Sequence, residues 1–164
     1  MVENIKKKSL LKWIITCFLI IAAAGLISRY AYRLMLIQGD SMKPAYHNMQ
    51  IVVLDVHSKD YSPGDVVAFD CPGFDSVLVK RIVAGPQDCV CITDEKLMIN
   101  GAISPDFEDA CFEFAGLLET EYRLGADEYI VIGDNIKESK DSRYGEVGVV
   151  SGDSIIGKIL KGST

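Results

Sequence analysis

The chain has 164 residues, which is enough for one compact domain and a short additional segment. It contains 17 basic and 23 acidic residues, and these are unevenly distributed. Residues 1–29 hold five basic residues and one acidic residue, whereas the rest of the chain holds 12 basic and 22 acidic residues. The acidic main part argues against nucleic acid as a partner, because phosphate contacts need a basic surface.

Residues 10–29 are strongly apolar and predict a transmembrane anchor. The uncharged part, residues 13–28, is slightly short of the roughly 20 residues that span a bilayer. Lys12 and Arg29 flank this part, and their long side chains can reach the interfaces and extend the usable length.

The orientation of the anchor follows from the lysines that precede it. Lys6, Lys7 and Lys8 lie on the N-terminal side of the apolar segment. The positive-inside rule therefore predicts a cytosolic tail, residues 1–9, and an extracytoplasmic domain, residues 30–164. The predicted location is the cell membrane, with a single pass and with the lipid bilayer as one partner.

Two other interpretations of this segment remain. It resembles a cleaved signal peptide, with Ala22–Ala24 as a small-residue site, but apolar residues continue without a break through Gly25–Ile27. It also resembles a core helix, but polar and apolar residues do not alternate along it. An uncleaved anchor is the preferred interpretation.

Beyond Arg33, short apolar runs recur between turn residues, and many of them are rich in β-branched side chains. This spacing predicts a mostly β domain with a coiled, barrel-like sheet. Asn100-Gly101 is a hairpin signal, and Phe112–Leu118 is a candidate short helix. The predicted strands are Leu34–Gln38, Gln50–Val56, Asp65–Phe69, Ser76–Val83, Cys89–Ile92, Lys96–Ile99, Glu128–Ile132 and Ser154–Leu160.

The cysteines and histidines do not have the spacing of a metal site. No pair of cysteines has the C-x-x-C spacing, and His47 and His57 are ten positions apart. We therefore expect no metal and no cofactor, and we expect both histidines to be structural or on the surface. The cysteines are either free thiols or include one disulfide, a choice that spacing leaves open. They are Cys17 in the apolar segment and Cys71, Cys89, Cys91 and Cys111 in the later domain.

Ser41 and Lys80 are the candidate reactive residues. A serine becomes a nucleophile when a base takes its proton, and no Ser-His-Asp set is evident. Lysine serves as that base in Ser-Lys enzymes, provided that burial disfavours its charged form. Lys80 lies in an apolar run and would share one strand face with Leu78 and Ile82, although a purely structural lysine remains an alternative. Arg81, on the opposite face, is expected to be an exposed charge.

Four motifs in order resemble those of a type I signal peptidase of the short, Gram-positive-like bacterial kind. The resemblance runs from the apolar segment to about Gly157. The absence of a long insertion before Gly133 means that the extra domain of longer relatives is missing. The motifs are Ser41-Met42-Lys43-Pro44, Gly64–Phe69, Val79–Asp88, and Gly133-Asp134-Asn135 with Ser139–Arg143 and Gly145.

The resemblance implies a role for each matching residue. It implies that Ser41 is the nucleophile, that Lys80 is the general base and that the Ser139 hydroxyl helps to orient the lysine amine. It also implies a supporting ion pair between Asp141 and Arg143, which without the motif would be an ordinary surface pair.

Three other matching positions concern the backbone. Gly133 and Gly145 are expected to be glycine because the backbone fits closely there. Gly39 stands where some relatives carry a serine, so the oxyanion hole would depend on backbone donors such as the Ser41 N–H. Ala45 replaces a common threonine, a change that we expect to be tolerated.

The implied function is a membrane-bound serine endopeptidase that removes N-terminal signal peptides from exported precursors, cutting after small residues. Substrate would bind as an extended strand along the edges near Leu36–Gly39 and Ser76–Val79. The candidate substrate-binding residues are Ile37, Gly39, Met42 and Val79. Ile37 and Met42 are equally well explained as core residues.

Two rival functions are less consistent with the sequence. A catalytically silent, membrane-anchored relative acting as a binding or chaperone-like module would not need Ser41, Lys80 and Ser139 together. A self-cleaving repressor-type Ser-Lys protease would need a DNA-binding head, and this chain has an apolar segment in that place.

Overall fold

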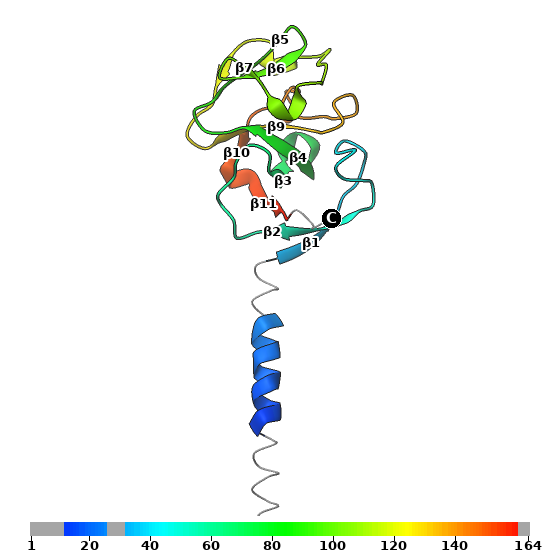
Figure 1. Cartoon of the computed structure of the whole chain (residues 1–164), viewed down its shortest axis with the longest axis vertical. Helices are drawn as coiled ribbons and strands as arrows, with labels where there is room; N and C mark the ends of the chain where they lie inside the picture. The colour runs from blue at the N-terminus through cyan, green and yellow to red at the C-terminus, as the bar shows by residue number, and fades with distance from the viewer. Residues whose placement is uncertain (1–11, 26–31, 161–164) are drawn as a thin grey trace, which may run out of the picture.

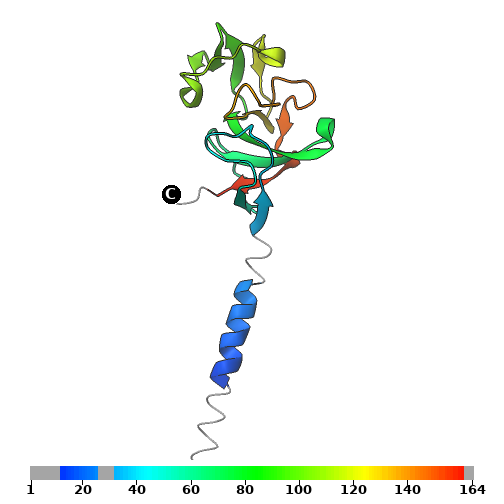
Figure 2. The ribbon, with the colours of Figure 1, turned by 90° about the vertical axis from the view of Figure 1, so that its right-hand side faces the viewer.

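A computed structural model describes residues 12–25 and 32–160. Residues 12–25 form a helix whose large apolar side chains are exposed, and it stands apart from a β-rich domain (Figures 1 and 2). Within the described residues, no helix has the length and apolarity needed to cross a membrane. The predicted anchor, residues 10–29, extends outside the described residues at both ends, and the predicted tail, residues 1–9, lies entirely outside them.

Residues 32–160 are mostly β, as the sequence predicts. The described strands form two antiparallel sheets. They are β1 (Tyr32–Leu36), β2 (Ile51–Asp55), β3 (Val66–Cys71), β4 (Ser76–Ala84), β5 (Cys89–Thr93), β6 (Lys96–Ile99), β7 (Ala102–Ile103), β8 (Tyr122–Arg123), β9 (Glu128–Ile132), β10 (Val150–Ser151) and β11 (Ile155–Ile159). Four short 3₁₀ turns accompany them, at Pro72–Phe74, Pro105–Phe107, Gly116–Leu118 and Gly152–Ser154.

The larger sheet has seven strands in the order β1-β2-β11-β3-β4-β9-β10. The smaller sheet has four, in the order β7-β6-β5-β8, and lies at the far end of the domain from the helix (Figure 1). Burial follows strand position. In β2 and β11, buried residues alternate with more exposed ones, whereas β3 and β9 are buried on both faces at nearly every position. Apolar alternation therefore marks the half-covered strands, and continuous apolar runs mark the covered ones.

The core consists of three apolar clusters that run the length of the domain. One cluster joins the two sheets through residues such as Val90, Leu97 and Ile130. The second lies around Val67, Phe69 and Val131 of the large sheet. The third packs Ile37 and Met42 against residues of β2, β3 and β11. The third cluster matters for function, because it fixes the segment that carries Ser41.

All eight predicted strands are present. Lys96–Ile99 and Glu128–Ile132 have the predicted bounds, and the others differ by one or two residues at one or both ends. The two-residue strands β7, β8 and β10 are too short for a sequence pattern to reveal. The predicted helix at Phe112–Leu118 is wrong, because only Gly116–Leu118 forms a 3₁₀ turn. Long-range hydrogen bonds hold this segment instead, from Phe112 N–H to Glu95 O and from Leu117 N–H to Arg143 O.

Asn100-Gly101 forms the predicted hairpin turn between β6 and β7. Both residues have positive φ, 51° and 80°, as a type I′ turn requires, and Ile99 faces Ala102 across the turn. All five cysteines are free thiols, with Cys71 buried. Both histidines are on the surface, as expected.

Candidate active site

Ser41 lies in a turn that follows β1 and that is fixed to the core on one side and to a distant loop on the other. The neighbouring Met42 side chain is 1% exposed and anchors the turn in the apolar cluster that contains Ile37. The Ser41 carbonyl accepts a 3.0 Å hydrogen bond from the Asn135 N–H, and the Asn135 side-chain amide donates to the Asp40 carbonyl at 3.2 Å. The Gly133–Asn135 motif thus fixes the backbone of Asp40 and Ser41 through two hydrogen bonds from Asn135.

Lys80 projects from β4, and its amine lies next to the Ser41 hydroxyl. Lys80 Nζ donates to Ser41 Oγ at 2.8 Å and to the Val79 carbonyl at 3.1 Å. The lysine is only 3% exposed. Strand pairing sets its position, because Lys80 faces Val67 across the β3–β4 ladder in the middle of the large sheet. A lysine with an exposed amine would be solvated, whereas this one is enclosed by the sheet.

Burial lowers the pKa of Lys80 from 10.5 to about 8. The negative charges of Asp141 and Asp134 act in the opposite direction but are outweighed by desolvation. A substantial fraction of Lys80 is therefore neutral near physiological pH. A neutral amine in hydrogen-bond contact with a serine hydroxyl can accept the hydroxyl proton.

Ser139 lies next to Gly133, in the loop whose Asn135 binds the Ser41 backbone. Its hydroxyl is buried, and it has no hydrogen-bond partner among the described residues. Gly133 leaves the space that the hydroxyl occupies. A Cβ on Gly133 would overlap Ser139 Oγ and would lie 2.6 Å from Ser41 O. Gly133 is therefore required by close packing, as predicted. Gly145 is not, because a Cβ there meets nothing within 4 Å.

Asp141 and Arg143 form a buried ion pair rather than a surface pair. Their side chains are 0% and 2% exposed, and Arg143 donates to both carboxylate oxygens, from Nε at 2.8 Å and from a terminal nitrogen at 2.9 Å. Arg143 also donates to the Ile136 and Ser139 carbonyls, at 2.9 and 3.3 Å. Asp141 accepts from the Gly133 N–H at 3.2 Å. One ion pair thus organises the whole loop that carries Gly133 and Ser139.

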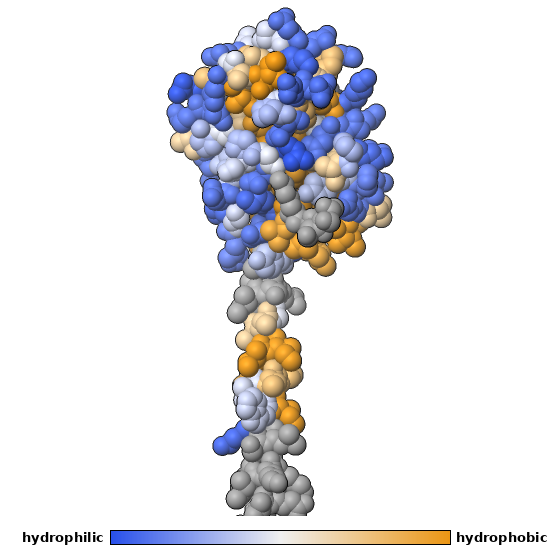
Figure 3. Space-filling model, viewed as in Figure 1, coloured by the Kyte–Doolittle hydropathy of each residue, from blue (hydrophilic) through white to orange (hydrophobic). Residues whose placement is uncertain are grey.

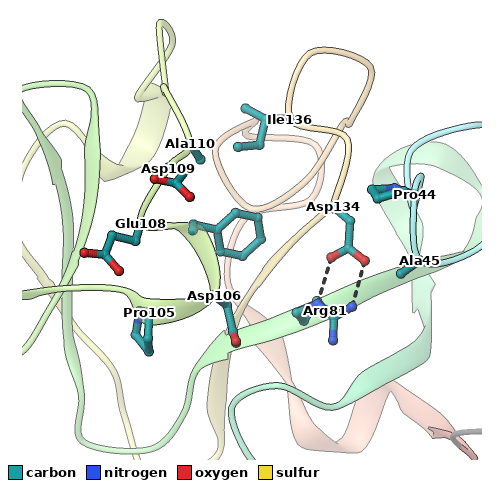
Figure 4. Close-up of a pocket in the computed structure, with 11 residues that line it drawn as sticks. Pro44, Ala45, Arg81, Pro105, Asp106, Glu108, Asp109, Ala110, Asp134 and Ile136 are labelled. Atoms are coloured by element: carbon teal, nitrogen blue, oxygen red, sulfur yellow. Dashed lines mark hydrogen bonds and ion pairs between the residues drawn. The ribbon is translucent and has the colours of Figure 1, made fainter.

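Arg81 is not the exposed strand charge that its position suggests. It is partly buried and pairs with Asp134 through two hydrogen bonds of 2.7 Å, as Figure 4 shows. It also donates to the Gly64 carbonyl at 2.8 Å. The pair ties β4 to the loop after β9, at the edge of a 740 Å³ cavity whose other side is formed by residues around Asp106 (Figure 4). Asp134 gave no separate signal in the sequence beyond its place in the Gly133–Asn135 motif.

A groove of 350 Å³ leads to Ser41 and Lys80. Its walls are Met35–Gln38, which includes the end of β1, and Ser76–Val79 of β4, with Met42 at its base. Of the predicted substrate-binding residues, Ile37, Met42 and Val79 line this groove. Ile37 and Met42 are also buried in the core, so both earlier interpretations of these residues apply.

Gly39 differs from the other three, because it does not line the groove. It is exposed, has φ of 90°, and its N–H donates to the Asn48 side chain at 2.9 Å. The positive φ explains why a glycine suits this turn.

The β4 edge of the groove lacks a strand partner. Strand β9 pairs with β4 only from Arg81 to Ala84, so on that side Ser76–Lys80 has no neighbour among the described strands. Strand β1 pairs with β2 on one side and forms an edge of the large sheet on the other. Two edges with free backbone groups therefore face the groove.

Comparison with known proteins identifies the family of this chain. The family described as "Signal peptidase, peptidase S26" matches residues 10–161. Signal peptidase I S of Bacillus subtilis strain 168 is 30% identical, and the match covers 87% of this chain and 84% of that protein. The chain belongs to the signal peptidase family.

Other members of the signal peptidase family agree with this assignment. Signal peptidase IB of Staphylococcus aureus strain Mu50 is 26% identical, over 93% of this chain and 88% of that protein. The chain in the crystal structure of a signal peptidase I from Enterococcus faecalis V583 is 25% identical in sequence to this chain, with a TM-score of 0.51. The match covers 62% of this chain and 97% of that chain. The function that follows from membership of this family is the removal of signal peptides from precursor proteins.

Proposed function

We propose that this signal peptidase family member is a serine endopeptidase in which Ser41 is the nucleophile and neutral Lys80 is the general base. The observation that carries the proposal is the 2.8 Å contact between Lys80 Nζ and Ser41 Oγ, made by a lysine that is buried in an apolar strand. Burial lowers the pKa of the lysine so that part of it is neutral near physiological pH, and the 2.8 Å contact places the hydroxyl proton within its reach.

The reaction is acyl transfer to water in two stages. Lys80 takes the proton of Ser41 as Oγ bonds to the carbonyl carbon of the residue before the cut. The C–N bond then breaks, and protonated Lys80 gives its proton to the leaving amine, so that an acyl-enzyme remains. In the second stage Lys80 takes a proton from water, the hydroxide adds to the acyl carbon, and Ser41 leaves with the proton.

The oxyanion of each stage would be stabilised by backbone donors. The Ser41 N–H has no acceptor among the described residues, which leaves it free to bind a developing negative charge. Gly39 supplies no side-chain donor. We therefore assign the first oxyanion donor to the Ser41 backbone.

We assign a positioning role to Ser139. A neutral lysine amine has two N–H donors and one lone pair, and the lone pair must face Ser41 when the proton moves. One N–H already has the Val79 carbonyl as acceptor. The buried Ser139 hydroxyl, which lacks a partner, is suited to accept the other. The Asp141–Arg143 pair supports this position by fixing the loop on both sides of Ser139.

The groove supports an extended substrate. A chain lying between Met35–Gln38 and Ser76–Val79 would add a strand along the free edges, and its backbone would supply most of the contacts. Ile37, Met42 and Val79 present an apolar lining of limited volume, which suits small side chains before the cut.

We further propose that residues 10–29 anchor a coiled, barrel-like β domain to the outer face of the cell membrane, with residues 1–9 in the cytosol. Exposed apolar side chains on β1 and β2, at the end of the domain nearest the helix in Figure 1, support this placement. Leu34 is 76% exposed and Ile51 is 67% exposed on the paired strands β1 and β2. Figure 3 shows apolar surface at this end of the domain.

The test is cleavage of a secretory precursor by the detergent-solubilised protein, with Ser41→Ala and Lys80→Ala as variants. Both variants should lose cleavage while retaining the fold, as measured by circular dichroism. A Lys80→Ala variant that cleaves as fast as the parent would contradict the assignment of the base.

A further inference from the structure

A second cavity opens from the same pair of reactive residues on a different side. It has a volume of 290 Å³ and shares Ser41, Ser76, Leu78 and Lys80 with the substrate groove. From these shared residues the two cavities diverge. The groove continues along the end of β1, whereas the second cavity continues toward three further residues, Phe74, Glu138 and Lys140.

The chemistry of the two cavities differs. Beyond the shared residues the groove is lined mainly by apolar side chains. The second cavity instead presents one carboxylate and one ammonium group. Glu138 and Lys140 flank Ser139, and their side chains are exposed, whereas Ser139 between them is buried. The loop that supports the reactive lysine thus also carries two charges into the adjoining space.

The two charges are held differently. Lys140 Nζ lies 3.9 Å from the centre of the Tyr144 ring, a cation–π contact that restricts the position of the ammonium group. The Glu138 carboxylate has neither a hydrogen bond nor an ion pair within residues 12–25 and 32–160. Each group can therefore meet a charged side chain of a bound peptide without first breaking an ion pair.

We propose that this cavity receives the first residues of the mature protein, just after the scissile bond, and that Glu138 and Lys140 determine the charge accepted there. The inference rests on the proposed function, in which residues before the cut occupy the groove. A chain that passes Ser41 must then leave through the cavity that diverges from the same four residues. An extended chain advances about 3.3 Å per residue, so the first two residues after the cut stay within about 7 Å of the bond.

Because Glu138 and Lys140 have opposite charges, reversing one charge or the other should shift the substrate preference in opposite directions. Replacing Glu138 by lysine leaves two positive charges and favours acidic residues after the cut. Replacing Lys140 by glutamate leaves two negative charges and favours basic residues. Exposed charges interact weakly, so each reversal should change the preference by about threefold to tenfold.

The experiment uses paired peptide substrates that are identical except for aspartate or lysine at the first or second position after the cut. The readout is the ratio of kcat/KM for the acidic substrate over the basic one, measured separately for each enzyme. A general loss of activity cancels in this ratio. Relative to the parent, Glu138→Lys should raise the ratio and Lys140→Glu should lower it, and both changes should shrink at high salt.

Lys137→Glu is the matched control. Lys137 is exposed in the same loop but does not line the cavity, so its reversal should leave the ratio at the parent value. The proposal is overturned if neither Glu138→Lys nor Lys140→Glu moves the ratio, or if Lys137→Glu moves it equally. Failure of the proposed function would look different, since the Ser41→Ala variant would then cleave these substrates as well as the parent does.

Discussion

Lys80 Nζ donates a 2.8 Å hydrogen bond to Ser41 Oγ across a sequence separation of 39 residues, at the centre of the large sheet. The contact combines a buried amine with a hydroxyl in a turn that is anchored on both sides. Burial lowers the pKa of the amine, so that part of it is neutral and able to act as a base. The same burial lowers the stability of the folded state, because the charged form of the amine is desolvated.

The pH dependence of cleavage should report the lowered pKa of Lys80. The neutral lysine is the active form, and its pKa is about 8, so kcat/KM should rise with pH and level off above that value. At two pH units below the pKa, only about 1% of the lysine is neutral, and the rate should fall roughly 100-fold. A pH–rate profile with a precursor peptide measures this. A flat profile from pH 6 to 9 would contradict a lysine base.

Lys80→Met should abolish cleavage but stabilise the fold at neutral pH. The folded state lowers the pKa of Lys80 from 10.5, so the unfolded chain holds the proton more tightly. This destabilisation is fully present below pH 8 and disappears as the pH rises toward 10.5. After allowance for the lost hydrogen bonds, the variant should gain about 1–3 kcal/mol at pH 7 and less at pH 10.

Urea unfolding of the β domain at the two pH values measures this gain. Lys137→Met provides the control, because Lys137 is exposed and should change stability little at either pH. A Lys80→Met variant that is less stable than the parent at pH 7 would show that packing or hydrogen bonding of the lysine outweighs its desolvation.

Asp141→Asn should destabilise the domain strongly. The substitution leaves the Arg143 guanidinium charged and buried without its carboxylate, at a cost of about 3–5 kcal/mol. Removing this negative charge should also lower the pKa of Lys80 further, because Asp141 acts to raise it. Denaturant unfolding gives the first effect, and the midpoint of the pH–rate profile gives the second.

The comparison for Asp141→Asn is an exposed ion pair on the same domain. Lys43 and Asp40 lie 3.0 Å apart with side chains 45% and 47% exposed. Lys43→Met should therefore change the free energy of unfolding by less than about 1 kcal/mol. If both substitutions cost the same, burial of the Asp141–Arg143 pair has no energetic consequence.

Gly133→Ala should reduce activity by about 100-fold, because the added Cβ displaces Ser139 Oγ and the Ser41 carbonyl from their positions. Steady-state kinetics with a precursor peptide gives the value. Gly145→Ala adds the same methyl group in the same loop region, where it meets nothing within 4 Å, and should retain parental activity. Equal losses in the two variants would argue against a steric role for Gly133.

Ser139→Ala should separate catalysis from stability. The Ser139 hydroxyl is buried without a hydrogen-bond partner among the described residues, so its removal should leave stability unchanged or raise it by up to about 1 kcal/mol. If the hydroxyl orients the Lys80 amine, kcat should nevertheless fall by about tenfold or more. An unchanged kcat in a well-folded variant would show that the Ser139 hydroxyl does not orient the Lys80 amine.

Local patterns in the sequence were sufficient to predict most of the β domain. Many of the eight strands are β-branched apolar runs with Gly or Pro nearby, and the Asn100-Gly101 turn has the residues that positive φ demands. The helix predicted at Phe112–Leu118 failed because contacts with Glu95 and Arg143 overrode the local preference. Local propensity is weak compared with such long-range contacts.

The sequence by itself determined which residues to expect at one site, because the motifs around Ser41, Lys80 and Ser139 occur in the order that the signal peptidase family has. Only the tertiary structure decided their environment. Apart from the family motif, the sequence pattern indicated an ordinary surface pair for Asp141 and Arg143, and it indicated an exposed charge for Arg81. In the structure all three side chains are buried or partly buried in ion pairs. Burial depends on which strands and loops pack together, and this packing also lowers the pKa of Lys80 beside Ser41.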